Sequence, residues 1–139
     1  GSRGLGDVYK RQYQTLAALA VKEGIDSRFH LLGAVDNPYP YYKAADIYVH
    51  ATRFEGKSIA IQEAQVLGCA IIASDCSGNR EQINDGVDGI LCGFTPAGIA
   101  DGIEKLITNP ALATKFRMAS AEKQINHLEE LQNIYGMMR

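Results

Sequence analysis

The chain lacks the features that mark several large classes of protein. It has three cysteines, Cys69, Cys76 and Cys92, an odd number without the paired CxxC spacing of zinc or redox sites. This pattern favours buried free thiols in a reducing compartment. No run approaches the roughly 18 consecutive apolar residues of a membrane span, and no signal-peptide pattern opens the sequence. The three histidines show no spacing typical of a metal triad.

The chain also has no excess of positive charge. Fourteen Lys and Arg residues stand against sixteen Asp and Glu residues, which gives a formal net charge of −2. No global field therefore favours nucleic acid or an anionic membrane, and any anion must be bound locally. With 139 residues, 46% of them hydrophobic, the chain has the size of one domain with a real core.

The first twelve residues resemble foreign sequence. Residues 2–12 read like one translated frame of a common transposon-type sequencing adapter. We therefore expect residues 1–12 to be non-native, natural sequence to start near Tyr13, and the gene to be cut on its 5′ side. Gly4 and Gly6 are then no phosphate loop, and they also lack a preceding strand and a third glycine.

Alternating apolar segments predict a parallel sheet. Helical spacing from Tyr13 ends at Gly24, and a short apolar strand is expected at 29–32. Further strands are expected at 47–50, 70–73 and 90–92, and helices at 41–45, 58–67 and 79–84. This order is typical of an α/β fold with helices on both faces. We expect a three-layer, Rossmann-like domain over residues 13–126.

The last third is predicted to be helical. Thr95-Pro96 and Asn109-Pro110 each combine an N-cap residue with proline at the first helical position. A last helix over residues 127–139 is expected to carry four apolar side chains on one face: Leu128, Leu131, Tyr135 and Met138. This face needs a partner.

Two carboxylates eight positions apart, Glu55 and Glu63, flank a predicted strand-to-helix turn. Glu55 falls in the loop and Glu63 on the helix. Ser58 is a candidate N-cap, and the N-terminus of the helix offers unpaired N–H groups and a positive dipole end. A phosphate prefers such a place, so the pattern indicates a grip on a nucleotide sugar.

Glu63 is expected to share a helix face with Ile59 and Leu67. A carboxylate on an apolar face needs hydrogen-bond donors, because burying it ionised without partners would cost several kcal/mol. The two hydroxyls of a ribose would satisfy it. The structural alternative is an ion pair with Arg53 or Arg80.

A second loop, with Ser77 and Gly78, follows the strand at 70–73 and is expected at the same edge of the sheet as Glu55. Arg80 and Glu81 are expected to form a local ion pair. His50 ends a strand at this edge. Four tyrosines are interpreted as packing residues rather than a stacking platform: Tyr39, Tyr41, Tyr42 and Tyr48.

The residues above resemble the C-terminal, donor-binding half of a family 4 retaining glycosyltransferase with the GT-B fold. The resemblance covers about residues 13–123, with Glu55 and Glu63 as the E-x7-E signature. It continues through an ordered series of segments: 29–33, 42–49, 63–68, 71–75, 77–78, Glu81 and 85–91. The chain would then be an incomplete C-terminal half of a GT-B fold.

The resemblance implies roles for the residues of the turn. Glu55 would contact hydroxyls of the donor sugar, and Glu63 would hold the ribose. Backbone N–H groups around Lys57, Ser58 and Ile59 would cradle the diphosphate, which Gly56 lets approach closely. The family implies retention of configuration, no divalent metal, and no cofactor besides the nucleotide-diphosphate sugar donor. Ser77 and Gly78 would form the second loop at the cleft.

The chain departs from the family pattern in several places. Lys57-Ser58 replaces an aromatic-glycine pair, and Ser77 stands where glycine is common. The Arg and Lys that clamp the diphosphate in relatives have no counterpart after Tyr13. By the same resemblance, we expect that the N-terminal acceptor-binding domain is missing from this sequence, and that the helix over 127–139 packs toward it. We therefore expect the polypeptide alone to be inactive.

By resemblance, the acceptor is a glycan or a lipid-linked molecule bound through the missing domain. The setting would be bacterial polysaccharide synthesis in the cytoplasm, with peripheral membrane contact and no nucleic acid. The sequence identifies neither the donor sugar and base nor the acceptor. Two alternatives stay open: a sugar-nucleotide epimerase or phosphorylase of the same architecture, and a noncatalytic nucleotide-binding module.

Overall fold

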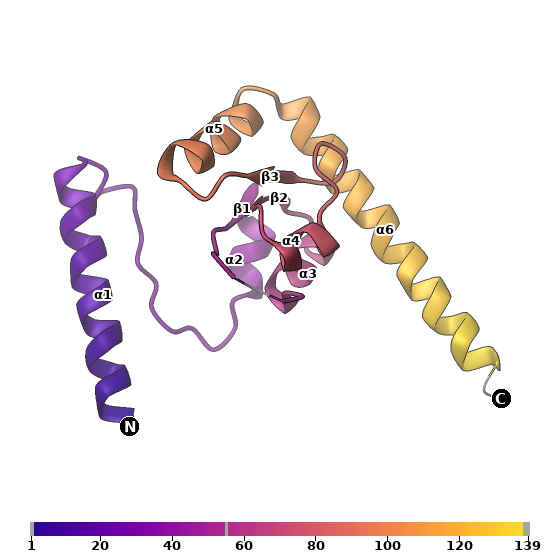
Figure 1. Ribbon diagram of the computed structural model, residues 1–139, viewed down its shortest axis with the longest axis horizontal. Coiled ribbons are helices and arrows are strands. Elements are labelled where there is room, and N and C mark those ends of the chain that lie inside the picture. Colours follow the sequence, from indigo (N-terminus) through magenta and orange to yellow (C-terminus); the bar gives the residue numbers. More distant parts are fainter. Residues whose placement is uncertain (1, 55, 138–139) are drawn as a thin grey trace. The chain divides into compact units, whose positions relative to one another are not determined.

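The computed structural model describes residues 2–54 and 56–137. The chain divides into two units, Gly1–Asn37 and Pro38–Arg139 (Figure 1). Each unit has its own internal structure and is described by itself.

The first unit holds one helix followed by irregular backbone. Helix α1 spans Ser2–Lys22, so the predicted helix is confirmed, although it begins within the segment that resembles an adapter. Gly24, with a φ of 71°, ends the helix in the left-handed conformation that glycine adopts without strain. The Ile25 N–H donates to the carbonyl of Ala20 at 2.9 Å and closes this cap.

The strand expected at 29–32 is wrong, because these residues have no regular secondary structure. An apolar run becomes a strand only when a neighbouring strand supplies ladder hydrogen bonds. Within the described residues, the three strands of the sheet all belong to the second unit, and the first unit has no strand.

The second unit is built on a parallel sheet. Its strands are β1 (Ile47–His50), β2 (Ala70–Ser74) and β3 (Ile90–Cys92), in the order β1-β2-β3, so the three remaining predicted strands are confirmed. The register pairs Ile47 with Ala70 and Ile72 with Ile90. All five residues of the central strand β2 are buried, as its continuous apolar run predicts.

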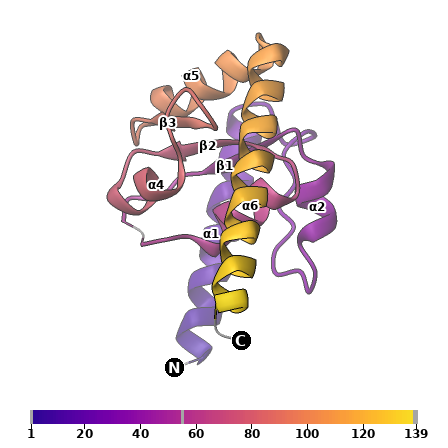
Figure 2. The same ribbon diagram turned by 90° about the vertical axis from the view of Figure 1, so that its right-hand side faces the viewer.

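Helices cover both faces of this sheet (Figures 1 and 2). On one face, α5 (Pro96–Ile107) and the start of α6 (Pro110–Met137) pack on Ala70 and Ile72 around the buried Phe116. On the other face, α2 (Tyr39–Ala44), α3 (Ile59–Val66) and the end of α4 (Ser77–Gln82) pack on Ile71 and Ala73. Since successive strand residues point to opposite faces, this alternation produces the expected three layers.

Helix α6 is one continuous helix, whereas the sequence suggested a separate last helix from residue 127. Between Pro110 and Gly136 the sequence has no proline or glycine to break it. Several of its apolar side chains beyond Gln124 are exposed, including Leu128, Leu131 and Tyr135. Met138 lies outside the described residues. Among the described helices, none is both long and apolar enough to cross a membrane.

Candidate functional site

The turn from β1 into α3 ends in a capped helix N-terminus. Ser58 has extended backbone, with φ −90° and ψ 125°, and its Oγ accepts the N–H of Ile61 at 3.3 Å. The predicted N-cap is thereby confirmed. The first-turn N–H groups of Ile59 and Ala60 have no acceptor within the helix and carry the positive end of its dipole. This terminus is suited to an anion.

The backbone of Ser58 itself is held by a side chain of α4. The Ser58 N–H donates to Gln82 Oε1 at 2.6 Å, and Gln82 Nε2 donates to the Ser58 carbonyl at 2.7 Å. Within the expected cradle of Lys57, Ser58 and Ile59, the N–H of Ser58 is thus already engaged, and the cradle itself stays a prediction. The N–H groups of Ile59 and Ala60 are not used by Gln82.

The loop before the turn is fastened to β2. The Thr52 N–H donates to Ser74 Oγ at 2.9 Å, and the Ser74 hydroxyl also forms a short hydrogen bond to the Thr52 carbonyl. The Ser74 carbonyl accepts from Asn79 Nδ2 at 2.8 Å. The loop after β1 and helix α4 are thus both fastened to β2 through one buried serine.

Both predicted loops line one surface hollow of about 760 Å³. The loop after β1 contributes Gly56, and the loop after β2 leads to Ser77, which also lines the hollow. Its described lining also includes four other residues: Arg53, Phe54, Asp75 and Cys76. Glu55, the predicted catalytic residue, lies outside the described residues. Gly78 is buried within α4 and is not part of the lining.

The two arginines near this hollow have partners that the sequence did not predict. The Arg53 guanidinium lies over the ring of Phe94, 5.3 Å from its centroid. Arg80 Nε donates to Asp75 Oδ1 at 2.5 Å, and this bond and the charge of Asp75 raise the pKa of Arg80 above its usual value. The expected ion pair of Arg80 with Glu81 is wrong, since neighbouring residues on a helix do not face each other.

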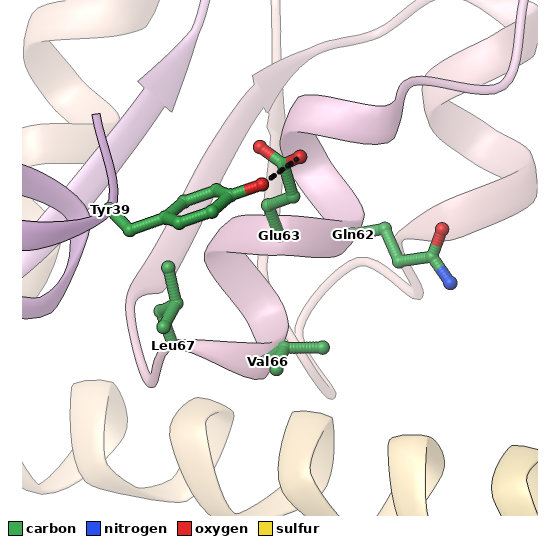
Figure 3. A pocket seen from close by; sticks show the side chains of 5 residues that line it. All are labelled: Tyr39, Gln62, Glu63, Val66 and Leu67. Carbon is green, nitrogen blue, oxygen red and sulfur yellow. Dashed lines mark hydrogen bonds between the residues drawn. The ribbon is translucent and has the colours of Figure 1, made fainter. Parts of the chain in front are cut away.

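Glu63 lines a second pocket, of about 320 Å³, on the side of α3 that faces α2 (Figure 3). The Tyr39 hydroxyl donates to Glu63 Oε1 at 3.2 Å, whereas Gln62 points away from this pair. The negative charge of Glu63 raises the pKa of Tyr39, and the hydrogen bond acts in the same direction. The expected need for a donor is therefore met in part by a tyrosine, rather than by Arg53 or Arg80.

The face of α3 that carries Glu63 is not the buried one. Ile59, four residues earlier, is 72% exposed. The helix buries a different face, made of Ile61, Ala64 and Gln65. The expected apolar face is confirmed on the side of Leu67, which lines the same pocket as Glu63, and is wrong for Ile59. Glu63 itself is half-buried rather than fully buried.

Tyr39 belongs to a chain of aromatic rings, for which the sequence predicts packing roles. Its ring centroid lies 6.4 Å from that of Tyr42, which lies 5.4 Å from Tyr48, and Tyr48 stacks on His50 at 5.8 Å. The Tyr48 hydroxyl and His50 Nδ1 are 3.0 Å apart. Packing describes Tyr42 and Tyr48, whereas Tyr39 contacts Glu63. The one feature of the sequence that could have indicated the contact between Tyr39 and Glu63 is the cluster of tyrosines just before β1.

Lys57 and two of the three cysteines, Cys69 and Cys92, do not line either of these two pockets. Lys57 lines a third, smaller pocket of about 100 Å³ with Glu81 and Gln82. Cys69 and Cys92 are buried free thiols, and burial raises the pKa of both, whereas Cys76 is half-buried. Within residues 2–54 and 56–137, no three His, Cys, Asp or Glu side chains gather in a way that could hold a metal ion.

Comparison with known proteins identifies the family. The family model described as glycosyl transferases group 1 matches residues 4–109. The chain belongs to this family. Its relatives include the lipopolysaccharide core biosynthesis mannosyltransferase LpcC of Rhizobium leguminosarum, 29% identical over 114 residues, with 81% of this chain and 31% of the relative covered.

Another relative is the N-acetylgalactosamine-N,N'-diacetylbacillosaminyl-diphospho-undecaprenol 4-alpha-N-acetylgalactosaminyltransferase of Campylobacter jejuni. It is 34% identical over 77 residues, which cover 55% of this chain and 21% of the relative. Among solved structures, Anabaena HepE in complex with UDP matches with a TM-score of 0.78 and 22% identity, covering 97% of this chain and 37% of that chain.

The chain therefore spans between 21% and 37% of the length of these relatives. The structural neighbours are GT-B glycosyltransferases, so the predicted α/β fold, part of a GT-B half, is confirmed.

Proposed function

We propose that this chain supplies the donor site of a retaining glycosyltransferase whose donor is a nucleoside diphosphate sugar. One observation carries the proposal: the capped N-terminus of α3 presents the N–H groups of Ile59 and Ala60, and Glu63 follows one turn later. Diphosphate and ribose are adjacent in every nucleoside diphosphate, so they need an anion site and a hydroxyl acceptor close together.

The helix sets the distance between these two parts. At about 1.5 Å per residue, Glu63 lies roughly 6 Å along the axis from Ile59, a span that a diphosphate and its ribose bridge. Tyr39 engages one carboxylate oxygen of Glu63. The other oxygen accepts the ribose hydroxyls. Glu55 is proposed to contact the donor sugar.

Transfer breaks the bond between the anomeric carbon and the diphosphate and forms one to an acceptor oxygen, whose proton is lost. The departing diphosphate carries the negative charge that develops in this step. The positive end of α3 and the Arg53 guanidinium at the adjoining hollow stabilise that charge. Retention of configuration and independence of a metal are part of the proposal.

The relatives support the donor and the acceptor. HepE has been solved with UDP and with UDP-glucose. The Campylobacter relative is named for a diphospho-undecaprenol acceptor, and LpcC for lipopolysaccharide core synthesis. We accordingly propose a glycan or lipid-linked acceptor, and a reaction in the cytoplasm at a membrane surface during polysaccharide synthesis.

The test is the affinity for UDP of a Glu63→Gln variant, which keeps the shape of the side chain and removes its charge. Loss of one charge-assisted bond is expected to weaken binding by about 2 kcal/mol, roughly 30-fold. Glu104→Gln, on the exposed surface of α5, is the matched control and leaves affinity unchanged. Unchanged affinity in Glu63→Gln together with a lower melting temperature would favour a noncatalytic module.

A further inference from the structure

Gln82, the last residue of α4, holds Ser58 in the turn from β1 into α3, which is the proposed donor site. Its side chain is 5% exposed and both of its amide atoms are used on Ser58, at 2.6 and 2.7 Å. A primary amide can accept from a backbone N–H and donate to the carbonyl of the same residue at once. These two bonds fix the orientation of Ser58.

The backbone of Gln82 is itself held from two sides. Its carbonyl accepts from Gln65 Nε2 of α3 at 3.2 Å and forms a short hydrogen bond with Lys123 Nζ of α6. Lys123 also pairs with the buried Asp88 at 3.1 Å. Helices α3, α4 and α6 therefore converge on one residue, and Gln82 has little freedom to move.

Ser58 directly precedes the first helical residue, so its orientation sets the direction of the next N–H groups. A phosphate bound at a helix start depends on the aim of these groups, because hydrogen bonds weaken steeply once misaligned. The amide of Gln82 fixes the turn without using the N–H of Ile59 or Ala60. It therefore acts on ligand binding only through Ser58.

We propose that Gln82 is a positioning residue for the donor diphosphate, which it serves by fixing Ser58 and thereby the N–H groups at the start of α3. The proposal rests on the proposed function and adds to it a residue outside the E-x7-E signature. No contact between Gln82 and the ligand is implied.

The experiment uses the full 139-residue chain with Gln82→Met, which keeps the length of the side chain and removes both hydrogen bonds. Gln124→Met is the matched control. It removes the 3.1 Å bond from Gln124 to Gln65 in the same polar layer and leaves both bonds between Gln82 and Ser58 in place. NMR titrations with UDP and with uridine give the affinity for the nucleoside with and without its diphosphate, and hydrogen exchange reports on the Ser58 amide.

Gln82→Met is expected to speed exchange at Ser58 at least tenfold and to weaken UDP binding about tenfold, while uridine binding changes less than twofold. Gln124→Met is expected to leave exchange at Ser58, UDP affinity and uridine affinity unchanged. If Gln82 had a purely structural role, Gln82→Met would lower the melting temperature and leave the ratio of UDP to uridine affinity as in the wild type. Should Gln82→Met not fold, Gln82→Glu serves: its carboxylate keeps the bond from the Ser58 N–H but loses the bond to the Ser58 carbonyl. With Gln82→Glu, exchange at Ser58 is expected to stay slow while UDP binding weakens relative to uridine, and an unchanged ratio of the two affinities would overturn the proposal.

Two failures are distinguishable. If the wild-type chain binds UDP and the Gln82 variant keeps the wild-type ratio of affinities, the positioning role is overturned and the donor site stands. If the wild-type chain binds none of UDP, GDP, ADP and CDP, the proposed function is overturned, and this inference with it.

Discussion

Ser74→Ala is expected to destabilise the loop after β1, which leads into the N-terminus of α3. The Ser74 hydroxyl is 1% exposed, accepts the Thr52 N–H at 2.9 Å, and also forms a hydrogen bond with the Thr52 carbonyl. Alanine removes both bonds, together with the longer one, 3.5 Å, from Ser74 Oγ to the His50 carbonyl, and adds no steric conflict. The half-buried N–H of Thr52 then has no acceptor.

The magnitude follows from these contacts. A neutral hydrogen bond contributes about 0.5–1.5 kcal/mol, and a buried donor left without a partner costs about 1–3 kcal/mol. We expect Ser74→Ala to lower the free energy of unfolding by about 2 kcal/mol. Ser120→Ala is the matched control, because Ser120 is equally buried but makes a single long bond, 3.4 Å, to the Asp88 carbonyl.

Urea unfolding of both variants measures the free energy, and amide exchange at Thr52 measures the local effect. Ser74→Ala is expected to unfold at clearly lower urea concentration than Ser120→Ala and to exchange faster at Thr52. It is also expected to weaken UDP binding, because the start of α3 follows this loop. If the two serine variants lose the same stability and Thr52 exchanges as in the wild type, the reasoning about this loop is refuted.

The other predictions concern packing and the thiols. Gly89→Ala would place a Cβ 2.9 Å from the backbone oxygen of Ile71 in the central strand. We therefore expect urea unfolding to show a free energy of unfolding lower by about 1–3 kcal/mol. In the control Gly136→Ala, the new Cβ meets no atom within 4 Å, so the protein should not be destabilised. Iodoacetamide should alkylate Cys76 well before Cys69 and Cys92, as mass spectrometry of timed samples would show; equal rates would contradict their burial. Burial raises the pKa of the Cys69 thiol above its usual 9.0. The neutral buried thiol therefore contributes its full stabilisation below pH 9.0, and this contribution is lost as the pH rises through the raised pKa. In Cys69→Ala, the free energy of unfolding should accordingly fall less steeply above pH 9.0 than in the wild type.

Local signals in the sequence were sufficient for most of the fold. Ser58 and Thr95 cap their helices through bonds to N–H groups three residues on, which is a contact that spacing alone predicts. The apolar content of 70–73 likewise predicts a central strand. The strand expected at 29–32 failed because strand formation depends on a partner, and the sequence does not state where that partner lies.

The site was only partly predictable for the same reason. Tyr39 and Glu63 are 24 positions apart, as are Ser58 and Gln82. Contacts across such distances arise from the packing of α2 and α4 beside α3, which no periodicity in the chain encodes. The turn, its cap and the convergence of two loops could be inferred from parallel topology. The partners of its side chains could not.

The most direct test of the donor site is a UDP titration of the wild-type chain, followed residue by residue through backbone amide chemical shifts. We predict saturable shifts that are largest at Gly56, Ile59 and Ala60 and extend to Glu63, with little change along α5. Largest shifts on α5 or the second half of α6, or no saturable shift with UDP, GDP, ADP or CDP, would contradict a nucleotide site at the start of α3.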